Sequence, residues 1–236
     1  MKVAIMQPYF FPYIGYWQLI HAVDRFVVYD DVNYIKRGWV NRNRLLINGQ
    51  PSFFTIPLVS SSQNKRICDL HMQPTIIWRQ KLAKTVENTY RKSPYFPEIF
   101  PTIEKILYFD SNSLADFLSH QIKSVLNLLG IKTEIVTSSR VYDNCSLAGK
   151  DRILDICKQE NTSIYINLPG GRNLYHATDF NDKEIKLAFL SVKPIHVNEK
   201  KVLFAPYLSI IDLLMKIGIS NVIENALLSY ELSTTN

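Results

Sequence analysis

The chain has 236 residues, of which 47% are hydrophobic and 12% aromatic, and its formal net charge is +6. This hydrophobic content is enough for a sizeable core and excludes a disordered chain. Lys and Arg are spread along the sequence without a block of five or six like charges, so we expect no nucleic-acid partner. No apolar run approaches 18 residues, which predicts that the protein has no membrane span.

The cysteines and the N-terminus predict a cytoplasmic protein. Cys68, Cys145 and Cys157 are odd in number and fit a reducing compartment. One Lys followed by four apolar residues does not resemble a signal peptide. The histidines are scattered without metal-ligand spacing, so we expect no metal. The sequence leaves homo-oligomerisation open.

The N-terminal segment predicts a βαβ unit. Residues 3–6 form an apolar run of the buried-strand type, residues 14–23 have apolar positions at helical spacing, and residues 25–29 predict a second strand. Ligands of such units bind beyond the carboxyl ends of the strands, where the first loop meets the helix. We therefore expect a ligand site at residues 7–15, with Asp30 and Asp31 as its candidate catalytic carboxylates.

The first loop of this unit is aromatic, whereas loops that cradle phosphates are usually rich in glycine. Its prolines predict a stiff backbone. Core packing explains any single ring more simply, but the segment as a whole favours a ligand site. The candidate binding residues in it are Gln7, Tyr9, Tyr13 and Tyr16.

A polar, basic segment follows at residues 33–44. It is either a solvated loop or hairpin arm, or a set of cations that hold a phosphate or carboxylate beside a stacking tryptophan. Under the second interpretation the candidate binding residues are Lys36, Arg37, Trp39, Asn41 and Arg42.

The remaining elements continue an α/β pattern. Asn-Gly at 48–49 predicts a hairpin between 45–47 and 52–58, and the last residues, SYELSTTN, are expected to be frayed. We predict one α/β domain over residues 1–236, a Rossmann-like, mainly parallel sheet with an inserted helical layer at about 75–129. Further strands are predicted at 67–72, 132–137, 163–167 and 185–190, and helices at 75–90, 94–107, 113–129, 151–160 and 208–217.

A second candidate loop follows the strand predicted at 163–167. Gly170 and Gly171 precede Arg172, which suggests an anion-binding nest, although an ordinary Gly-Gly turn explains the pair equally well. His176 is the histidine best placed to reach a site, and an exposed or structural histidine is the simpler alternative.

The chain resembles the WbqC-like family. The resemblance is carried by MQPYFFPYIGYWQLI, VYDDVNYIKRGWVNRNR, LPGGRNLY and LSIIDLLMKIG, and it extends to about residue 217. Members of that family are associated with bacterial surface-polysaccharide gene clusters, O-antigen clusters in particular. The resemblance therefore implies a role in making or modifying a nucleotide-linked sugar for lipopolysaccharide.

A fainter resemblance links the opening to the HIGH-motif nucleotidyltransferases and the pantothenate-synthetase type of ligase. Those enzymes have His-x-Gly-His at the helix start, where this chain has Tyr13-Ile14-Gly15-Tyr16. Tyrosine donates a hydrogen bond but carries no positive charge near neutral pH. The replacement argues against ATP-dependent adenylation, while the likeness supports a Rossmann-like sheet.

Two classes of function fit these observations. The first is a transferase or ligase that moves an acyl or aminoacyl group to the amine of a nucleotide-linked amino sugar, with Asp30 or Asp31 as the general base. Its co-substrate would be a nucleotide or an acyl donor. The second is a non-catalytic protein that binds a sugar nucleotide or glycan, and a glycosyltransferase ranks third.

Overall fold

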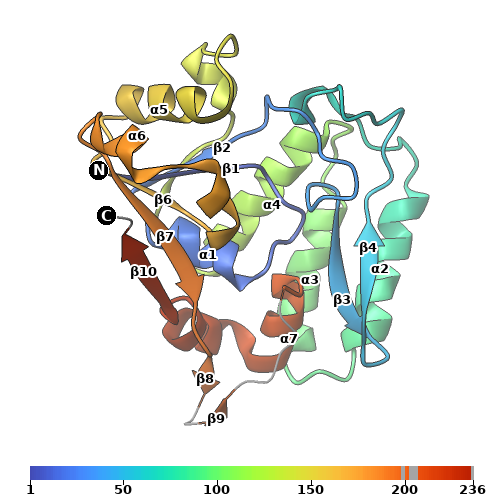
Figure 1. Ribbon diagram of the computed structural model, residues 1–236. Coiled ribbons are helices and arrows are strands. Elements are labelled where there is room, and N and C mark those ends of the chain that lie inside the picture. The colour runs from blue at the N-terminus through green and yellow to red at the C-terminus, as the bar shows by residue number, and fades with distance from the viewer. Residues whose placement is uncertain (198–199, 202–206, 235–236) are drawn as a thin grey trace.

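The computed structural model describes residues 1–197, 200–201 and 207–234 (Figure 1). Its centre is a six-stranded sheet of order β10-β7-β6-β1-β2-β5, in which only the β10–β7 pair is antiparallel. This confirms the predicted α/β, Rossmann-like, mainly parallel sheet. The strands are β1 (Lys2–Met6), β2 (Arg25–Val28), β5 (Glu134–Val136), β6 (Ile164–Asn167), β7 (Lys186–Val192) and β10 (Tyr230–Thr234).

Helices cover both faces of the sheet because successive side chains of each strand point to opposite faces. Ala4 of β1 joins the core beneath α1 (Ile14–His21), α4 (Leu114–Leu128) and α7 (Ile210–Asn221). Val3 and Ile5 join a second core beneath α5 (Gly149–Gln159) and α6 (Ala177–Asn181). The two sets of helices lie on opposite sides of the strands in Figure 1.

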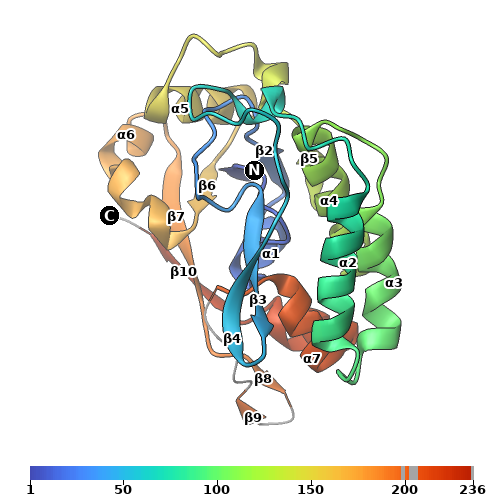
Figure 2. The same cartoon turned by 90° about the vertical axis from the view of Figure 1, so that its right-hand side faces the viewer.

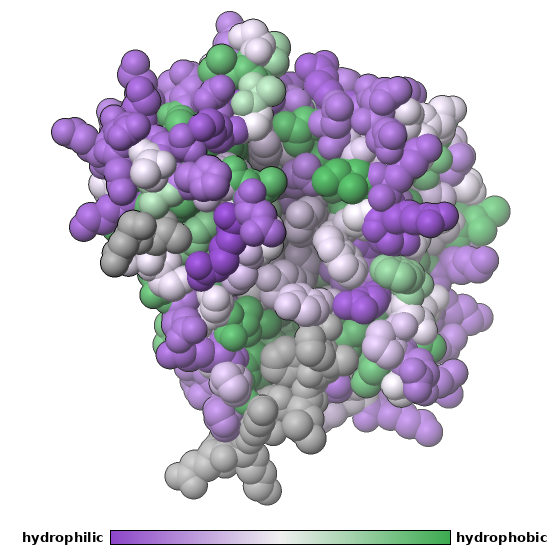
Figure 3. Space-filling model, viewed as in Figure 1, coloured by the Kyte–Doolittle hydropathy of each residue, from purple (hydrophilic) through white to green (hydrophobic). Residues whose placement is uncertain are grey.

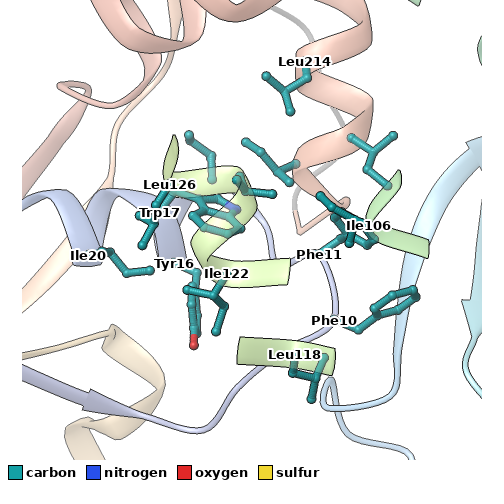
Figure 4. Close-up of a cluster of buried hydrophobic side chains, with 14 of the residues drawn as sticks. Phe10, Phe11, Tyr16, Trp17, Ile20, Ile106, Leu118, Ile122, Leu126 and Leu214 are labelled. Carbon is teal, nitrogen blue, oxygen red and sulfur yellow. The ribbon is translucent and has the colours of Figure 1, made fainter. Parts of the chain in front are cut away.

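The predicted helical insertion consists of α2 (Ile77–Tyr90), α3 (Phe96–Leu107) and α4, which lie side by side in Figure 2. Ser113 caps α4, and its hydroxyl accepts a hydrogen bond from the Asp116 backbone N–H at 3.3 Å. Figure 4 shows Leu118 and Ile122 of α4 beside the aromatic side chains of the first loop and α1. The insertion thus shares the main core.

A hairpin of β3 (Arg42–Ile47) and β4 (Gln50–Thr55) stands apart from the main sheet. It is the hairpin predicted around Asn48 and Gly49, and its first strand begins at Arg42, within the basic segment 33–44 for which a hairpin arm was one interpretation. A third, two-stranded sheet pairs β8 (His196–Val197) with β9 (Lys200–Lys201). Within the described residues, no helix is both long and apolar enough to cross a membrane.

Two sequence predictions are wrong. Residues 67–72 contain a 3₁₀ turn, Ile67–Asp69, where we predicted a strand, because the backbone N–H groups of Asp69 and Leu70 bond back to the carbonyls of Arg66 and Ile67. The C-terminal residues that we expected to be frayed form a strand as far as Thr234, since β10 pairs with β7 over five residues. A polar end segment can still form an edge strand, because its backbone satisfies the hydrogen bonds of the neighbouring strand.

Candidate functional site

The order of the strands creates a crevice at the carboxyl ends of β1 and β6. From β1 the chain moves to β2 and β5 on one side, and it then returns to β6 and β7 on the other side. Ligands of open α/β sheets bind outside the carboxyl ends at this topological switch point. A cleft of about 1070 Å³ opens there, and Figure 3 shows the hollow in this face of the protein.

Four segments build the walls of this cleft. They are the loop after β1, the loop after β6, the end of β7, and the hairpin, which contributes Asn43 of β3. The lining side chains that carry rings, amides or charge are Gln7, Tyr9, Tyr13, Tyr29, Trp39, Asn43, Asn167, Tyr175, Lys193 and Tyr207. The lining is therefore rich in aromatic faces and amide groups, which suits a ligand with rings and hydroxyl groups.

The loop after β1 is held by buried amides from outside the sheet. Phe11 has φ 41°, in the left-handed region that costs energy for a residue with a side chain. Its backbone N–H donates to Gln121 Oε1 of α4 at 2.7 Å. Asn43 Nδ2 of β3 donates to the carbonyls of Phe10 at 2.9 Å and Phe11 at 2.8 Å. The insertion and the hairpin thus hold the strained loop in the conformation that lines the cleft.

Tyr13 lies over the start of α1 because residue 15 is glycine. A Cβ at Gly15 would lie 2.5 Å from Tyr13 Cε2, so any other residue would displace the ring. Tyr13 is also the N-cap of α1, and its side chain makes no capping hydrogen bond. The first turn of α1 contains no acidic residue. The positive end of this helix therefore lies in the wall of the cleft.

The tyrosines of the cleft are hydrogen-bond donors at neutral pH. Burial raises the pKa of Tyr13 to about 12, with smaller contributions from Tyr207 and Tyr9. Burial also raises the pKa values of Tyr9, Tyr29 and Tyr175. The rings of Tyr13 and Tyr207 pack edge to face, with their centroids 5.3 Å apart. With these raised pKa values, the hydroxyls of Tyr9, Tyr13, Tyr29 and Tyr175 stay protonated near pH 7 and can donate hydrogen bonds to acceptor oxygens.

The loop after β6 is a 3₁₀ turn, Pro169–Leu174. Asn167 fixes the backbone just before it, because its Oδ1 accepts the backbone N–H of Leu168 at 2.7 Å and its Nδ2 donates to the Tyr165 hydroxyl at 3.2 Å. A Cβ at Gly171 would lie 2.8 Å from Asn167 Nδ2, so this glycine permits close packing. Gly170 and Gly171 line the cleft.

The two adjacent carboxylates lie outside the cleft lining. The Asp30 side chain is 1% exposed, and its Oδ1 accepts hydrogen bonds from Ser138 Oγ at 2.8 Å and from the Ser139 backbone N–H at 3.1 Å. Asp31 pairs with Arg152, whose Nη2 lies 2.5 Å from Asp31 Oδ2. Burial raises the pKa of Asp30. Both predicted catalytic carboxylates are thus engaged in a network beside β2.

The predicted cations also have other partners. Arg42 donates to the backbone carbonyls of Gly38, at 3.2 Å, and of Arg37, and its guanidinium lies 4.2 Å from the centroid of the Phe53 ring. Arg172 Nη2 donates to Ser233 Oγ of β10 at 2.5 Å. Neither is a lining residue, and exposed Lys36 and Arg37 are not either. The described lining contains the cation Lys193, whose Nζ lies 3.4 Å from Glu231 Oε2.

Three further predicted residues lie outside the lining. Tyr16 is fully buried, and its hydroxyl donates to the Gln7 carbonyl at 3.0 Å beneath the loop. Asn41 is buried, and it accepts from the Tyr34 hydroxyl and donates to the Ile56 carbonyl. His176 is exposed at the start of α6. Tyr16 and Asn41 are therefore structural residues that hold the backbone around the cleft.

The family model of the WbqC-like protein family matches residues 7–224 of this chain. This chain belongs to the WbqC-like family. The match confirms the resemblance carried by the motifs of the first loop. A similar protein of Mycobacterium tuberculosis, described as the uncharacterized protein Rv1507c, is 28% identical over 223 residues, which are 92% of this chain and 94% of that protein. No solved structure matches the chain.

Several lining residues of this WbqC-like protein are absent from the sequence-based candidate set. Tyr29, Asn167 and Lys193 each lie at or just after the carboxyl end of a strand, so the rule that pointed to Gln7 and Asp30 also points to them. Asn43 and Tyr207 come from outside the sheet; Asn43 lies within the polar, basic segment 33–44, whereas no sequence signal marks Tyr207. Within the described residues, no three His, Cys, Asp or Glu side chains form a candidate metal site.

Proposed function

We propose that this WbqC-like protein binds a nucleotide-linked amino sugar in the cleft and serves the synthesis of a bacterial surface polysaccharide such as the O-antigen of lipopolysaccharide. The observation that carries the proposal is the cleft itself, which lies at the switch point of the sheet and is lined by tyrosines, a tryptophan and amides. Aromatic faces stack on sugars and bases, and amides pair with hydroxyl and carbonyl groups.

Two features of the cleft suggest how such a ligand is oriented. The N-terminus of α1, at Tyr13 and Ile14, has no side-chain cap, and its positive dipole end would attract the diphosphate. Lys193 at the end of β7 adds a positive charge to the same cleft. The sugar and the base would then lie against Tyr9, Trp39 and the amide of Gln7.

The reaction that we propose is transfer of an acyl or aminoacyl group from an activated donor to the sugar amine. The amine nitrogen forms a bond to the acyl carbon, the bond from that carbon to its leaving group breaks, and the leaving group takes the amine proton. Protonated tyrosines would donate hydrogen bonds to the oxygen that becomes negative during the attack. The cleft would therefore contribute orientation and oxyanion stabilisation.

One observation favours a second candidate, a non-catalytic sugar-nucleotide-binding protein. Asp30, Asp31 and His176, the predicted acid–base groups, all lie outside the lining. The two carboxylates already have partners in the buried network, so their engagement fits a structural role. A binding protein would need only the aromatic and amide groups that the cleft presents.

Calorimetry and turnover on the same protein would test the proposal. We expect UDP- or dTDP-linked amino sugars to bind, and Gln7→Leu to weaken binding about 3- to 10-fold by removing one hydrogen-bonding amide at similar volume. Gln80→Leu, at an exposed position on α2, is the matched control and should bind like the parent protein. Mass-spectrometric detection of an N-acylated product separates the enzyme from the binding protein. Failure of every nucleotide sugar to bind would refute both.

A further inference from the structure

The mouth of the cleft carries exposed aliphatic side chains. Ile35 and Leu174, which line the cleft, are 58% and 66% exposed, whereas the lining residues Ile5 and Ile153 are each 3% exposed. Large aliphatic side chains that gather in the open around one cavity need an explanation.

The exposed apolar residues converge on the cleft from separate segments. Ile35 precedes the hairpin, Leu174 ends the turn after β6, and Tyr207, which is 59% exposed, lies just before α7. We call these three residues the apolar rim. Single exposed hydrophobic side chains are ordinary, whereas a group around one cavity marks a binding surface. Figure 3 shows apolar side chains around the hollow in this face.

Backbone contacts hold two of the rim residues in place. The Ile35 carbonyl accepts a hydrogen bond from the Gly38 N–H at 3.0 Å, and a Cβ at Gly38 would lie 3.4 Å from Ile35 Cβ. The turn that carries Leu174 is closed by the Gly171 N–H, which donates to the Leu168 carbonyl at 2.9 Å. The rim is thus formed by regular turns that keep aliphatic side chains at the mouth of the cleft.

We propose that the apolar rim binds an aliphatic chain of the ligand while Gln7 and the aromatic side chains of the cleft bind its sugar. The inference rests on the proposed function and specifies its substrate class: one substrate or product combines a glycosyl group with an aliphatic chain. The chain is either the acyl group attached to the sugar amine or the lipid carrier attached through phosphate. Both sources present the same methylene chemistry to Ile35 and Leu174.

A homologous series of ligands tests this proposal by calorimetry. We would measure UDP-glucosamine and its N-acetyl, N-butanoyl and N-hexanoyl forms, with farnesyl phosphate as the lipid-carrier arm. Affinity should rise along the acyl series by about fourfold or less for each methylene that becomes buried. A rise in the acyl series assigns the chain to the sugar amine, and tight binding of farnesyl phosphate alone assigns it to the carrier.

Two rim variants and a control provide the decisive comparison. Ile35→Thr and Leu174→Gln replace apolar side chains of the rim with polar ones. They should remove the dependence on chain length but leave the affinity for UDP-glucosamine unchanged. Ile77→Thr, at a 65% exposed position on α2, should keep the full dependence.

The outcomes that contradict the inference are distinct from those that contradict the proposed function. An affinity that does not change with chain length in the parent protein, together with weak farnesyl phosphate binding, overturns the aliphatic-chain site. Equal loss of affinity for all UDP sugars in the rim variants also overturns it, because the rim would then contact the sugar. In both cases, tight binding of UDP-glucosamine by the parent protein would leave the proposed function standing.

Discussion

The carboxyl ends of β1 and β2 are neighbours in one sheet, but the structure uses them differently. The end of β1 leads into the cleft through Gln7 and Tyr9, and its loop is held from behind by Asn43. The end of β2 leads into a buried network in which Asp31 pairs with Arg152. The two adjacent carboxylates, which the sequence marks most clearly as catalytic candidates, therefore stabilise the fold at the end of β2. Aromatic and amide residues form the open site.

Breaking the ion pair beside β2 should have the largest effect. The side chains of Arg152 and Asp31 are 4% and 2% exposed, and Arg152 Nε also donates to Asn144 Oδ1 at 2.9 Å. Arg152→Ala leaves a buried carboxylate without its partner, which typically costs about 3–5 kcal/mol of unfolding free energy. Denaturant unfolding measures the loss.

The control for this prediction is the exposed ion pair of Arg66 and Asp69, in which Arg66 Nε lies 2.9 Å from Asp69 Oδ2. Arg66→Ala should leave the unfolding midpoint almost unchanged, because exposed ion pairs contribute little. Comparable destabilisation by the two variants would contradict the contrast between a buried, structural end of β2 and ordinary surface charge.

Releasing the loop after β1 should cost both stability and binding. Asn43→Ala removes the donors to two buried carbonyls, at Phe10 and Phe11, and an unsatisfied buried polar group costs about 1–3 kcal/mol. The same change frees the strained backbone of Phe11, so ligand affinity should fall as well. Unfolding and calorimetry on one preparation measure both effects. Asn127→Ala, at an exposed position on α4, is the control and should alter neither.

A smaller change at the start of α1 should reduce binding without destabilising the fold. Gly15→Ala places a methyl group where the Tyr13 ring lies, so the ring must leave its position. Alanine favours the helix, and loss of one aromatic contact should weaken binding by about tenfold or less. In a Tyr13→Ala background, Gly15→Ala should add no further loss of affinity. Additive losses would show that Gly15 acts without Tyr13.

The smallest expected effect is a pH dependence at the end of β2. Burial raises the folded-state pKa of Asp30 above 3.8, so ionisation is less favourable in the folded protein than in the unfolded chain. The resulting stabilisation is fully present below pH 3.8 and is lost as the pH rises through the folded-state pKa. Asp30→Asn should therefore become more stable relative to the parent protein as the pH rises through this window.

Asp69 provides a control of opposite sign. Its hydrogen bond with Arg66 lowers its pKa below 3.8, so its stabilisation is lost as the pH falls through the folded-state value. Asp69→Asn should become less stable relative to the parent protein as the pH rises. Thermal unfolding across the acid range, with all three proteins in the same buffers, measures both trends. Equal trends for the two variants would contradict the burial of Asp30.

The fold was predictable because its signals are local. Apolar runs, helical spacing and the Ser113 cap predict the strands and α4, and the motifs of the first loop predict the family. Part of the site was predicted as well. Gln7, Tyr9, Tyr13, Gly170 and Gly171 come from loops at the carboxyl ends of strands, Trp39 comes from the basic segment 33–44, and all six line the cleft.

The rest of the site depends on the direction of each side chain, which the rule of carboxyl ends does not specify. Tyr29 and Asp30 are adjacent in sequence, yet Tyr29 lines the cleft while Asp30 bonds to Ser138 and Ser139. Arg172 leaves the cleft because β10 supplies the acceptor Ser233, and the sequence predicted no strand there. Hydrogen-bonding partners that are distant in sequence therefore decide which polar side chains line the cleft.

The pairing of β1 with β6 also has a consequence for how the protein folds and unfolds. Lys2 pairs with Ile164, so the two walls of the cleft come from opposite ends of a long loop of chain. Contacts of such wide sequence separation are slow to form because loop closure must come first. If the β1–β6 junction consolidates after the folding transition state, a ligand bound there would leave the folding rate nearly unchanged and would slow unfolding. Residence of the ligand would then lengthen the lifetime of the native protein, including its resistance to proteases that act on transiently opened chains.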